Sequence, residues 1–481
     1  MKKKQPKRQN QPNRQSQPQP RVQVPRVGLI SLGCPKNLVD SEVMAGYLVE
    51  KGFDFTGDPE EAEVIIVNTC SFIGPAIEEA KQSLREMIQL KEEGNCLALI
   101  CAGCLPQREG EALVAEFPEV DAFLGVDQIP QVAEIAAQLL GVQEGIELPR
   151  TIGKATYLYD DTAPRLLTTP PWTAYVKVAE GCLHRCSFCT IPAIRGDFRS
   201  RQIDSVVREV EDLVNTGVGE IVLTAQDTTA YGRDIGTSLA ALLRELDKIE
   251  ELHWLRLMYG YPGEITDELL EIMRSSSKIC NYLDIPLQHA HPRILREMHR
   301  PGSAEEYLAL IAKLRAAMPE IALRSAFIVG FPGETEAEFQ TLLDFLGQAQ
   351  LDRVGAFVYC REPGTKAAEL DGQVPEEVAQ ERFHRLMALQ QQISLQRNQL
   401  CIGKKLEVVI EGEADEGLIG RTFRDAPEID GEVVLELPPQ RFMPGDGDFV
   451  MAEITGASEY DLTGRLADLP PAPANVDSRK K

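Results

Sequence analysis

From Val27 to about Gln399, short apolar runs alternate with longer amphipathic stretches, a pattern typical of α/β proteins with parallel sheets. In the first part of the chain, apolar runs begin at Val27, Val64 and Cys96, and amphipathic stretches at about 37–51 and 75–93 separate them. These runs show little polar alternation, as expected for strands that are buried on both faces. We therefore predict an amino-terminal parallel α/β domain over residues 27–140.

A second series of strands and helices follows at residues 171–400. Six candidate strands alternate with amphipathic stretches, and they cover Ala174–Val178, Glu220–Thr224, Trp254–Met258, Tyr282–Ile285, Ala322–Val329 and Val354–Tyr359. Six such units predict an incomplete TIM-like barrel, (β/α)6, with its functional residues in loops at the carboxyl ends of the strands. A long helix at about 375–399 ends the series. The stretch 141–170 lacks periodicity and contains several prolines, so it is predicted to link the two domains.

The pattern changes again after Cys401, where short alternating runs are separated by Gly, Pro and Asp. These runs predict a small antiparallel β-barrel at residues 401–470. Residues 1–26 are rich in Gln, Pro and Asn, carry eight basic side chains and no acidic one, and are predicted to be disordered. This basic tail either contacts ribosomal RNA or has no specific role. Residues 471–481 are also expected to be disordered.

Composition and charge narrow the possible classes of protein. No run approaches the roughly 18 consecutive apolar residues of a membrane span, and no apolar segment follows the basic amino terminus as in a secretory signal. The eleven cysteines are clustered and lack a secreted disulfide pattern, which fits a reducing cytoplasm where thiolates bind metal. A net charge of -24 is unusual for a protein that binds nucleic acid.

The most informative motif is Gly-Cys-Leu-His-Arg-Cys-Ser-Phe-Cys, which contains Cys182, Cys186 and Cys189. Three thiolates at this spacing hold three irons of a 4Fe-4S cluster and leave the fourth iron open, as in a catalytic site. A zinc site is the alternative, but zinc prefers four ligands and the nearby His184 lies between two of the cysteines. With Phe188 before the last cysteine, the motif resembles the radical S-adenosylmethionine (SAM) signature. In that superfamily, the open iron binds the amino and carboxylate groups of SAM.

Polar residues and glycines after successive predicted barrel strands are the candidates for holding SAM. They are Gln226 and Asp227 after the second strand, Gln288 after the fourth, Arg324 on the fifth, and Gly330 beyond it. Any one of them could instead be an ordinary turn or capping residue. Three arginines soon after the motif could bind a substrate carboxylate, stabilise the cluster's negative charge or simply pair with local acids; they are Arg195, Arg199 and Arg201.

Three further cysteines, Cys34, Cys70 and Cys104, each follow one of the first three predicted strands. Parallel strands end at one edge of their sheet, so we expect these three thiols to lie together and to hold a second cluster. Cys101 competes with Cys104, but it falls within the strand and is expected in the core. The remaining cysteines have the same core interpretation: Cys96, Cys280, Cys360 and Cys401.

Together the motifs resemble one family, the radical-SAM methylthiotransferases, over residues 27–470. The resemblance rests on Gly33–Asn37, Asn68–Cys70, Gly103–Leu105 and the Cys182–Cys189 motif, while the last domain resembles an OB-like TRAM domain. It implies a second 4Fe-4S cluster on Cys34, Cys70 and Cys104 that carries the sulfur, and an electron donor such as flavodoxin or ferredoxin. One SAM would methylate that sulfur, and another would yield a radical that removes hydrogen from an unactivated carbon.

Family members act on one of two substrates: adenosine in tRNA, or the β-carbon of an aspartate in the twelfth protein of the small ribosomal subunit. Three local sequences resemble those of the protein-modifying branch: Leu183–Arg185, Asp425–Gly431 and Ile454–Leu462. Residues 402–470 also carry sixteen acidic side chains against six basic ones, which would repel phosphates and suit a basic ribosomal protein. We therefore predict the protein substrate, with tRNA as the alternative. A non-enzymatic iron-sulfur carrier or zinc protein is a third interpretation.

Overall fold

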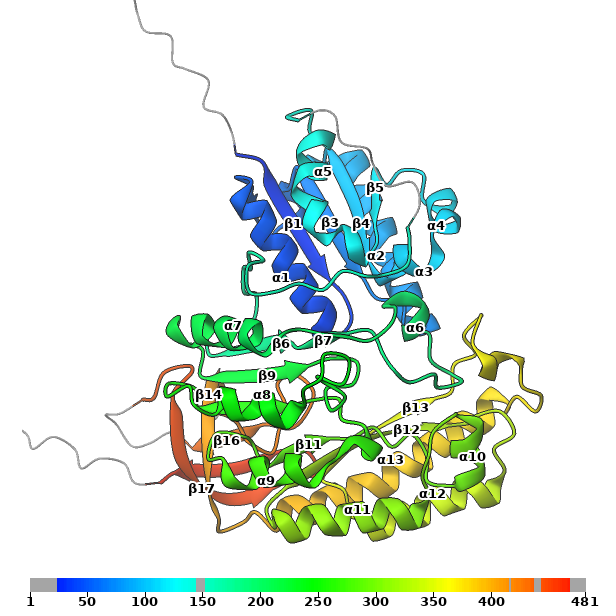
Figure 1. Ribbon diagram of the computed structural model, residues 1–481, viewed down its shortest axis with the longest axis vertical. Helices are drawn as coiled ribbons and strands as arrows, with labels where there is room; N and C mark the ends of the chain where they lie inside the picture. Colours follow the sequence, from blue (N-terminus) through cyan, green and yellow to red (C-terminus); the bar gives the residue numbers. More distant parts are fainter. Residues whose placement is uncertain (1–23, 144–151, 415–416, 437–442, 468–481) are drawn as a thin grey trace, which may run out of the picture.

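The computed structural model describes residues 24–143, 152–414, 417–436 and 443–467. Three domains follow one another along the chain: the amino-terminal domain stands on the central one, and the last packs beside the central one (Figure 1). The predicted disordered tails lie outside the described residues, except that residues 24–26 are described and Arg26 begins the first strand. Within the described ranges, every helix is too short or too polar to cross a membrane.

The amino-terminal domain is built on a five-stranded parallel sheet in the order β2-β1-β3-β4-β5. Its strands are β1 (Arg26–Ser31), β2 (Asp54–Phe55), β3 (Val64–Thr69), β4 (Ala98–Gly103) and β5 (Ala122–Leu124). Its helices are α1 (Pro35–Glu50), α2 (Gly74–Glu93), α3 (Cys104–Glu109), α4 (Glu111–Glu116) and α5 (Val132–Leu139), with short 3-10 turns η1 (Pro59–Glu61) and η2 (Val126–Gln131).

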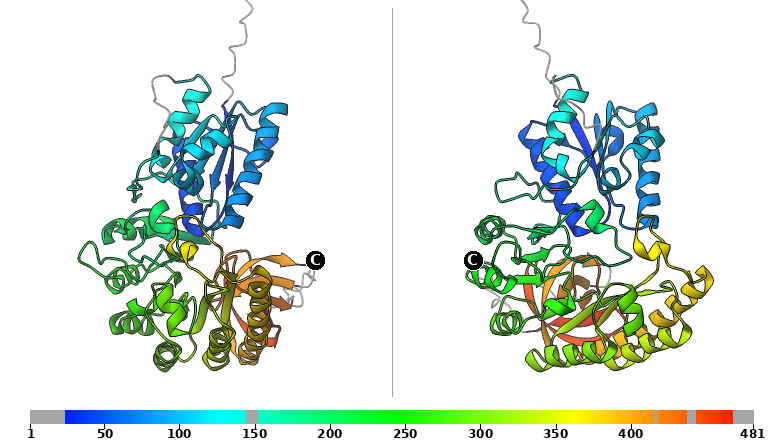
Figure 2. Two further views of the ribbon diagram at one scale, coloured as in Figure 1. Left: turned by 90° about the vertical axis from the view of Figure 1, so that its right-hand side faces the viewer. Right: turned by 45° about the vertical axis from the view of Figure 1, so that its right-hand side comes forward.

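Helices cover both faces of this sheet, which explains why its central strands begin with continuous apolar runs (Figure 2). Every residue of β3 and β4 is buried. Val64 and Ile66 of β3 pack with α1 and α5, whereas Ile65 and Val67 pack with α2 on the opposite face. The strand therefore alternates between two hydrophobic cores.

The central domain contains six parallel strands in consecutive order, as the sequence predicted. They are β6 (Thr173–Lys177), β9 (Glu220–Thr224), β10 (Trp254–Leu257), β11 (Tyr282–Asp284), β12 (Ala322–Val329) and β13 (Arg353–Val358). Regular pairing joins β6-β9-β10 and β11-β12-β13, and a single bridge from Leu255 to Ile279 connects the two groups. The result is the predicted incomplete barrel.

Helices follow the barrel strands and cover their outer side (Figure 1). They are α7 (Ile203–Asn215), α8 (Leu239–Leu246), α9 (Asp267–Ser275), α10 (Pro292–Glu297), α11 (Ala304–Ala317), α12 (Glu336–Ala349) and α13 (Glu376–Gln399). The shorter elements are β7 (Ala179–Glu180), α6 (Ile191–Ile194), β8 (Arg199–Ser200), η3 (Pro262–Glu264) and η4 (Lys366–Glu369). Because β7 and α6 flank the cysteine motif, that motif lies in a loop just beyond the first barrel strand.

The described part of the predicted linker, residues 152–170, runs between the two domains and contacts both. Arg165 lies 2.6 Å from Glu42 of α1 and 2.7 Å from Glu209 of α7. All three side chains are at least nine-tenths buried, so this ion pair network is shielded from water. The segment therefore fixes the amino-terminal domain to the barrel.

The last domain is a closed five-stranded barrel in the order β14-β15-β16-β18-β17. Its strands are β14 (Lys405–Ala414), β15 (Gly417–Thr422), β16 (Val433–Glu436), β17 (Phe449–Ala457) and β18 (Leu462–Leu466). The predicted small antiparallel barrel is present, and the structure adds one detail, since β16 and β18 pair in parallel. A closed ring with an odd number of strands cannot alternate direction all the way round, so one parallel pair is unavoidable.

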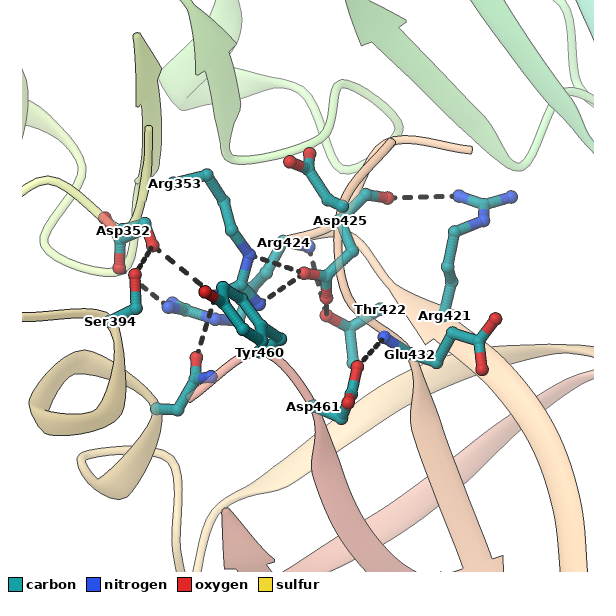
Figure 3. A network of polar contacts seen from close by, with 12 residues as sticks. Asp352, Arg353, Ser394, Arg421, Thr422, Arg424, Asp425, Glu432, Tyr460 and Asp461 are labelled. Atoms are coloured by element: carbon teal, nitrogen blue, oxygen red, sulfur yellow. Dashed lines mark hydrogen bonds and ion pairs between the residues drawn. The ribbon is translucent and has the colours of Figure 1, made fainter. Parts of the chain in front are cut away.

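Buried ion pairs join this last barrel to the central domain (Figure 3). Arg424 lies 2.7 Å from Asp352, and Asp425 lies 2.6 Å from Arg353. Arg421 pairs with Glu220, the first residue of β9, which also contacts Arg256 at 2.8 Å. Two of the six basic residues of the last domain therefore face inward.

Candidate functional site

Cys34, Cys70 and Cys104, called here the amino-terminal cysteines, lie at the carboxyl edge of the first sheet. Cys34 precedes α1, Cys70 directly follows β3, and Cys104 follows β4 as the first residue of α3. All three are free thiols. The sequence predicted that these three cysteines share one edge of the sheet. Cys101, in contrast, packs in the hydrophobic core against α2.

The Asn68-Thr69 pair before Cys70 ties the other two cysteine loops to this edge. The Asn68 side chain donates to the carbonyl oxygen of Asn37 at 2.9 Å, beyond Cys34. The Thr69 hydroxyl donates to the carbonyl oxygen of Ala102 at 2.6 Å, just before Cys104. Gly33 has a φ of +96°, and a Cβ there would lie 2.7 Å from Cys70 Cβ. The glycine therefore leaves room for the Cys70 thiol.

Cations and burial act in opposite directions on these thiols. Burial alone would raise the pKa of Cys34, but Lys36 and Arg195 outweigh it and hold that pKa below its ordinary value. Burial raises the pKa of Cys104 to about 12, although Arg195 opposes the shift. Cys34 and Cys70 also act to raise the pKa of Cys104.

Arg195 of the central domain reaches into this group of thiols. Its Nη2 lies 3.1 Å from Cys104 Sγ and donates to Asn37 Oδ1 at 3.1 Å. Its Nη1 contacts Asp40 at 2.6 Å and Glu180 at 3.2 Å. Lys177 pairs with the same two carboxylates. Because all of these charges are buried, the two domains meet through one compact ionic network.

Cys182, Cys186 and Cys189, called here the central cysteines, occupy the loop between β7 and α6. The loop is held from two sides: Ser187 Oγ donates to the carbonyl oxygen of Glu297 at 2.7 Å, and Thr190 Oγ1 donates to that of Phe72 at 3.2 Å. Burial is the main cause that raises the pKa of Cys182 to about 11 and that of Cys189 to about 12. Phe72 belongs to the loop after Cys70, so the two cysteine groups are directly linked.

His184, between two central cysteines, belongs to a fixed side-chain stack. Its Nε2 lies 2.6 Å from Asp227 Oδ2, and its ring stacks on Tyr261 with centroids 3.7 Å apart. The Arg300 guanidinium covers the same tyrosine and lies 3.8 Å from Cys186 Sγ. Asp227 therefore orients the loop of the central cysteines.

Several buried polar atoms at the carboxyl end of β9 have no hydrogen-bond partner among the described residues. They are Thr224 Oγ1, Gln226 Oε1 and Thr228 Oγ1. The Gln226 amide nitrogen donates to Glu180, which fixes the side chain of Gln226 and leaves its amide oxygen without a partner. Buried polar groups are nearly always paired, and this cluster therefore fits a site that binds a polar ligand.

The other SAM candidates have structural roles that the sequence did not show. Arg324 pairs with Asp284 at 3.0 Å and with Asp430 of the last domain at 3.3 Å. Gln288 has a φ of +71° and bridges to β12. Gly330 has a φ of +74°, and a Cβ there would lie 2.5 Å from Ala379 Cβ, so close packing of α13 accounts for this glycine.

Of the three arginines that follow the central cysteines, Arg199 and Arg201 interact with nearby groups. Local pairing was one of the interpretations that the sequence left open. Arg201 pairs with Glu209 of α7, and Arg199 donates to backbone carbonyl oxygens. Sequence reasoning missed the roles of Lys36, Glu180 and Glu362. Lys36 and Glu180 stand within two residues of a motif cysteine, which was the available signal; Glu362 had none.

The donor chemistry of both cysteine groups fits iron-sulfur clusters better than a single ion. Among the residues that the structure describes, no three His, Cys, Asp or Glu side chains gather closely enough to hold one metal ion. A cluster spreads its thiolate ligands over several iron atoms, so its ligands need not converge on one point. Nearby cations also suit the negative charge of thiolate-bound iron.

Family models match all three domains. Residues 26–125 match a family described as "Uncharacterized protein family UPF0004", residues 176–346 match the "Radical SAM superfamily", and residues 402–467 match the "TRAM domain".

Curated relatives are similar to the chain over nearly its full length. The "Ribosomal protein uS12 methylthiotransferase RimO" of Pelotomaculum thermopropionicum is 51% identical over 444 residues, which cover 91% of this chain and 98% of the relative. The protein of the same description from Desulforamulus reducens is 48% identical over 92% of this chain and 100% of the relative.

Among solved structures, the radical S-adenosylmethionine methyltransferase TsrM from Kitasatospora setae, with cobalamin and a [4Fe-4S] cluster bound, has a similar fold. Its TM-score is 0.54 with 16% sequence identity, and the match covers 72% of this chain and 74% of that chain. At this identity, the similarity concerns the fold alone.

Proposed function

The chain belongs to the RimO family of radical-SAM methylthiotransferases, and from that premise we propose that it methylthiolates ribosomal protein uS12 at the β-carbon of an aspartate. The chain is an enzyme that transfers a sulfur-containing group, and it uses SAM and 4Fe-4S clusters. The single observation that carries the proposal is the meeting of two cysteine groups across one domain boundary, with Arg195 beside Cys104.

We assign the central cysteines to one 4Fe-4S cluster and the amino-terminal cysteines to the second. The buried polar end of β9, with Gln226, is the best candidate to hold SAM. When bound, these groups supply one-electron and radical chemistry and the sulfur atom that is transferred.

The chain's own residues provide position and shelter for that chemistry. Arg195 and Lys177 hold Asp40 of the first domain against Glu180 of the second, which fixes the relative place of the two cysteine groups. Asp227 and Tyr261 orient the loop of the central cysteines through His184. Burial of this network excludes water from the boundary, which protects a reactive intermediate from side reactions.

A protein substrate suits the charge of the TRAM domain better than tRNA does. Its basic residues Arg421 and Arg424 are buried against Glu220 and Asp352, so they cannot neutralise phosphates at the surface. Two of its acidic residues, Asp425 and Asp430, are buried in ion pairs as well, so the exposed charge of the domain remains acidic, as its composition indicates. An acidic surface would steer a basic ribosomal protein toward the enzyme.

A peptide assay tests the proposed function directly. The reconstituted enzyme is incubated without oxygen with SAM, a reductant, sulfide and a uS12 peptide, and the peptide mass is measured. We expect a methylthio adduct at the aspartate. If SAM is turned over without an adduct on this peptide, and digested tRNA contains adenosine with a 2-methylthio group on its base, the tRNA alternative would be favoured.

Two further features of the proposal concern the cell. A ribosomal substrate places the enzyme in the cytoplasm, and the one-electron chemistry requires a donor such as flavodoxin or ferredoxin. Purified flavodoxin with its reductase should replace a chemical reductant in the peptide assay. Failure of both flavodoxin and ferredoxin would indicate a different class of donor.

A further inference from the structure

A buried lysine of the amino-terminal domain lies at the mouth of the central barrel. Lys36 stands in the first turn of α1, two positions after Cys34, and is 8% exposed. Its Nζ lies 3.2 Å from the centroid of the Tyr259 ring, and Tyr259 follows barrel strand β10. The cation therefore stands between the amino-terminal cysteines and the carboxyl ends of the barrel strands.

Lys36 differs from the other buried cations of the domain boundary in its partners. Lys177, Arg195 and Arg165 each contact two carboxylates. Within the described ranges no carboxylate forms an ion pair with Lys36, and its ammonium group instead packs on the aromatic ring of Tyr259. Its negative neighbour on the amino-terminal domain is the Cys34 thiolate, whose charge it favours. A lysine ammonium group has three N–H donors, so Lys36 can bind a further anion at this position.

The nearby acid, Asp284 at the end of β11, is already engaged. Its Oδ1 accepts from Arg324 at 3.0 Å, and its Oδ2 accepts from the backbone N–H of Tyr259 at 3.1 Å. Tyr259 itself has a φ of +60°, which is unfavourable for a residue with a side chain. Such strain persists where the surroundings fix it, and it clusters at ligand sites. The ring under Lys36 is therefore held in place before any ligand arrives.

Resting on the function proposed above, we propose that Lys36 binds the side-chain carboxylate of the target aspartate and thereby selects aspartate over uncharged residues. In aspartate, the carboxylate carbon is bonded directly to the β-carbon that receives the sulfur. A group that holds this carboxylate must therefore lie beside the source of the sulfur. Lys36, two residues from Cys34, meets that requirement.

Peptide binding tests this role without relying on turnover. Fluorescent uS12 peptides with Asp, Asn or Ala at the target position are titrated by anisotropy against the reconstituted enzyme, without reductant. We expect the wild type to bind the Asp peptide about tenfold more tightly than the Asn peptide, which corresponds to about 1.4 kcal/mol. Lys36→Met and Lys36→Gln should reduce this ratio to about one, whereas Lys36→Arg should retain most of it.

Lys51 provides the matched control, because it is an exposed lysine just beyond the other end of α1. Lys51→Met should leave the Asp/Asn ratio unchanged. A wild-type ratio of one would overturn the proposal, whatever the variants do. An unchanged ratio in the charge-removing variants, with or without loss of iron, would also overturn it and would restrict Lys36 to balancing the charge of the nearby thiolates.

Kinetics give a second measurement and separate this proposal from the parent function. Lys36→Met should raise KM for the Asp peptide about tenfold, in line with the lost binding. If the wild type binds the Asp peptide selectively but never forms a methylthio adduct, the proposed reaction fails and the carboxylate site stands. If the adduct forms with no preference for aspartate in binding, the reaction stands and the role of Lys36 fails.

Discussion

Arg195 and Cys104 belong to different domains, yet Nη2 of the arginine lies 3.1 Å from Sγ of the cysteine. The same guanidinium contacts Asp40 of the amino-terminal domain and Glu180 of the central domain. One side chain therefore joins the amino-terminal cysteines to the ionic network that holds the domains together. Changes at Arg195 should affect stability and iron binding at the same time.

Replacing Arg195 by Gln should lower the free energy of unfolding by about 3–5 kcal/mol, because it leaves Asp40 and Glu180 buried with Lys177 as their remaining cation. Urea unfolding of the reconstituted protein measures this loss. Arg199→Gln is the control, since Arg199 donates to carbonyl oxygens at a half-buried position, and it should cost about 1 kcal/mol. Equal losses in the two variants would contradict the role of the network.

The two cysteine groups should separate into two activities. Cys186→Ala should stop cleavage of SAM while the amino-terminal cluster remains, because it removes a ligand from the central group alone. Iron analysis should fall from about eight to about four atoms per chain, and the formation of 5′-deoxyadenosine measures the cleavage.

Cys104→Ala should have the complementary effect: SAM cleavage continues, but no methylthio product forms. Cys101→Ala is its matched control, because Cys101 is fully buried in the hydrophobic core three residues earlier. The control should retain its iron and its product. If Cys101→Ala instead loses the product while Cys104→Ala keeps it, the ligand assignment is wrong.

Glu362 should hold the cysteine loops of the first domain onto the barrel. Its Oε1 accepts from the backbone N–H of Gly74 at the start of α2, and its Oε2 contacts Arg108 of α3, both at 2.6 Å. Glu362→Gln should weaken the contact with Arg108 and speed amide hydrogen exchange in residues 70–76 and 104–109, as measured by mass spectrometry. The exposed Glu369 of the same loop offers the control, and Glu369→Gln should leave exchange unchanged.

Acid should loosen the TRAM domain through Glu220. Although burial alone would raise the pKa of Glu220, Arg421 and Arg256 outweigh it and lower that pKa to about 2 from its ordinary value of 4.5. Because this pKa is lowered in the folded protein, ionised Glu220 stabilises the fold above about pH 4.5. This stabilisation, about 3 kcal/mol, is lost as the pH falls toward 2.

Glu220→Gln tests this pH dependence. The variant should be less stable than the wild type at pH 7, because two buried arginines lose their shared carboxylate. Between pH 4.5 and 2 its stability should change less steeply than that of the wild type. Parallel pH profiles in chemical denaturation would show that Glu220 is not the group responsible.

Local patterns predicted the elements and the cysteine groups well, for a physical reason. Strand β3 begins with four apolar residues and is buried throughout because helices cover both of its faces, and the loop after a parallel strand must lie at the sheet edge. The positions of Cys34, Cys70 and Cys104 follow from these two facts alone. The six barrel strands were predicted on the same basis.

Contacts between domains could not be predicted in this way. The pairing of Lys36 with Tyr259, or of Glu362 with Gly74, depends on how two finished domains pack, and periodicity along one element carries no information about that packing. Charge counting was also incomplete, since the count for the last domain treated Arg421 and Arg424 as surface charges. They are buried, but Asp425 and Asp430 of the same domain are buried too, so the net charge of the exposed surface stays acidic, as the composition indicated.

The inward-facing arginines of the last barrel also limit which TRAM domains from other proteins could replace the one in this chain. A TRAM domain transplanted from another protein would leave Glu220 and Asp352 of the central barrel with only Arg256 and Arg397 as partners, unless it carried arginines at the positions of Arg421 and Arg424. Successful chimaeras, and natural exchanges of this domain during evolution, should therefore preserve these two acids and the two TRAM arginines as a set. We therefore expect the TRAM domain and the residues of the central barrel that it contacts to be inherited together.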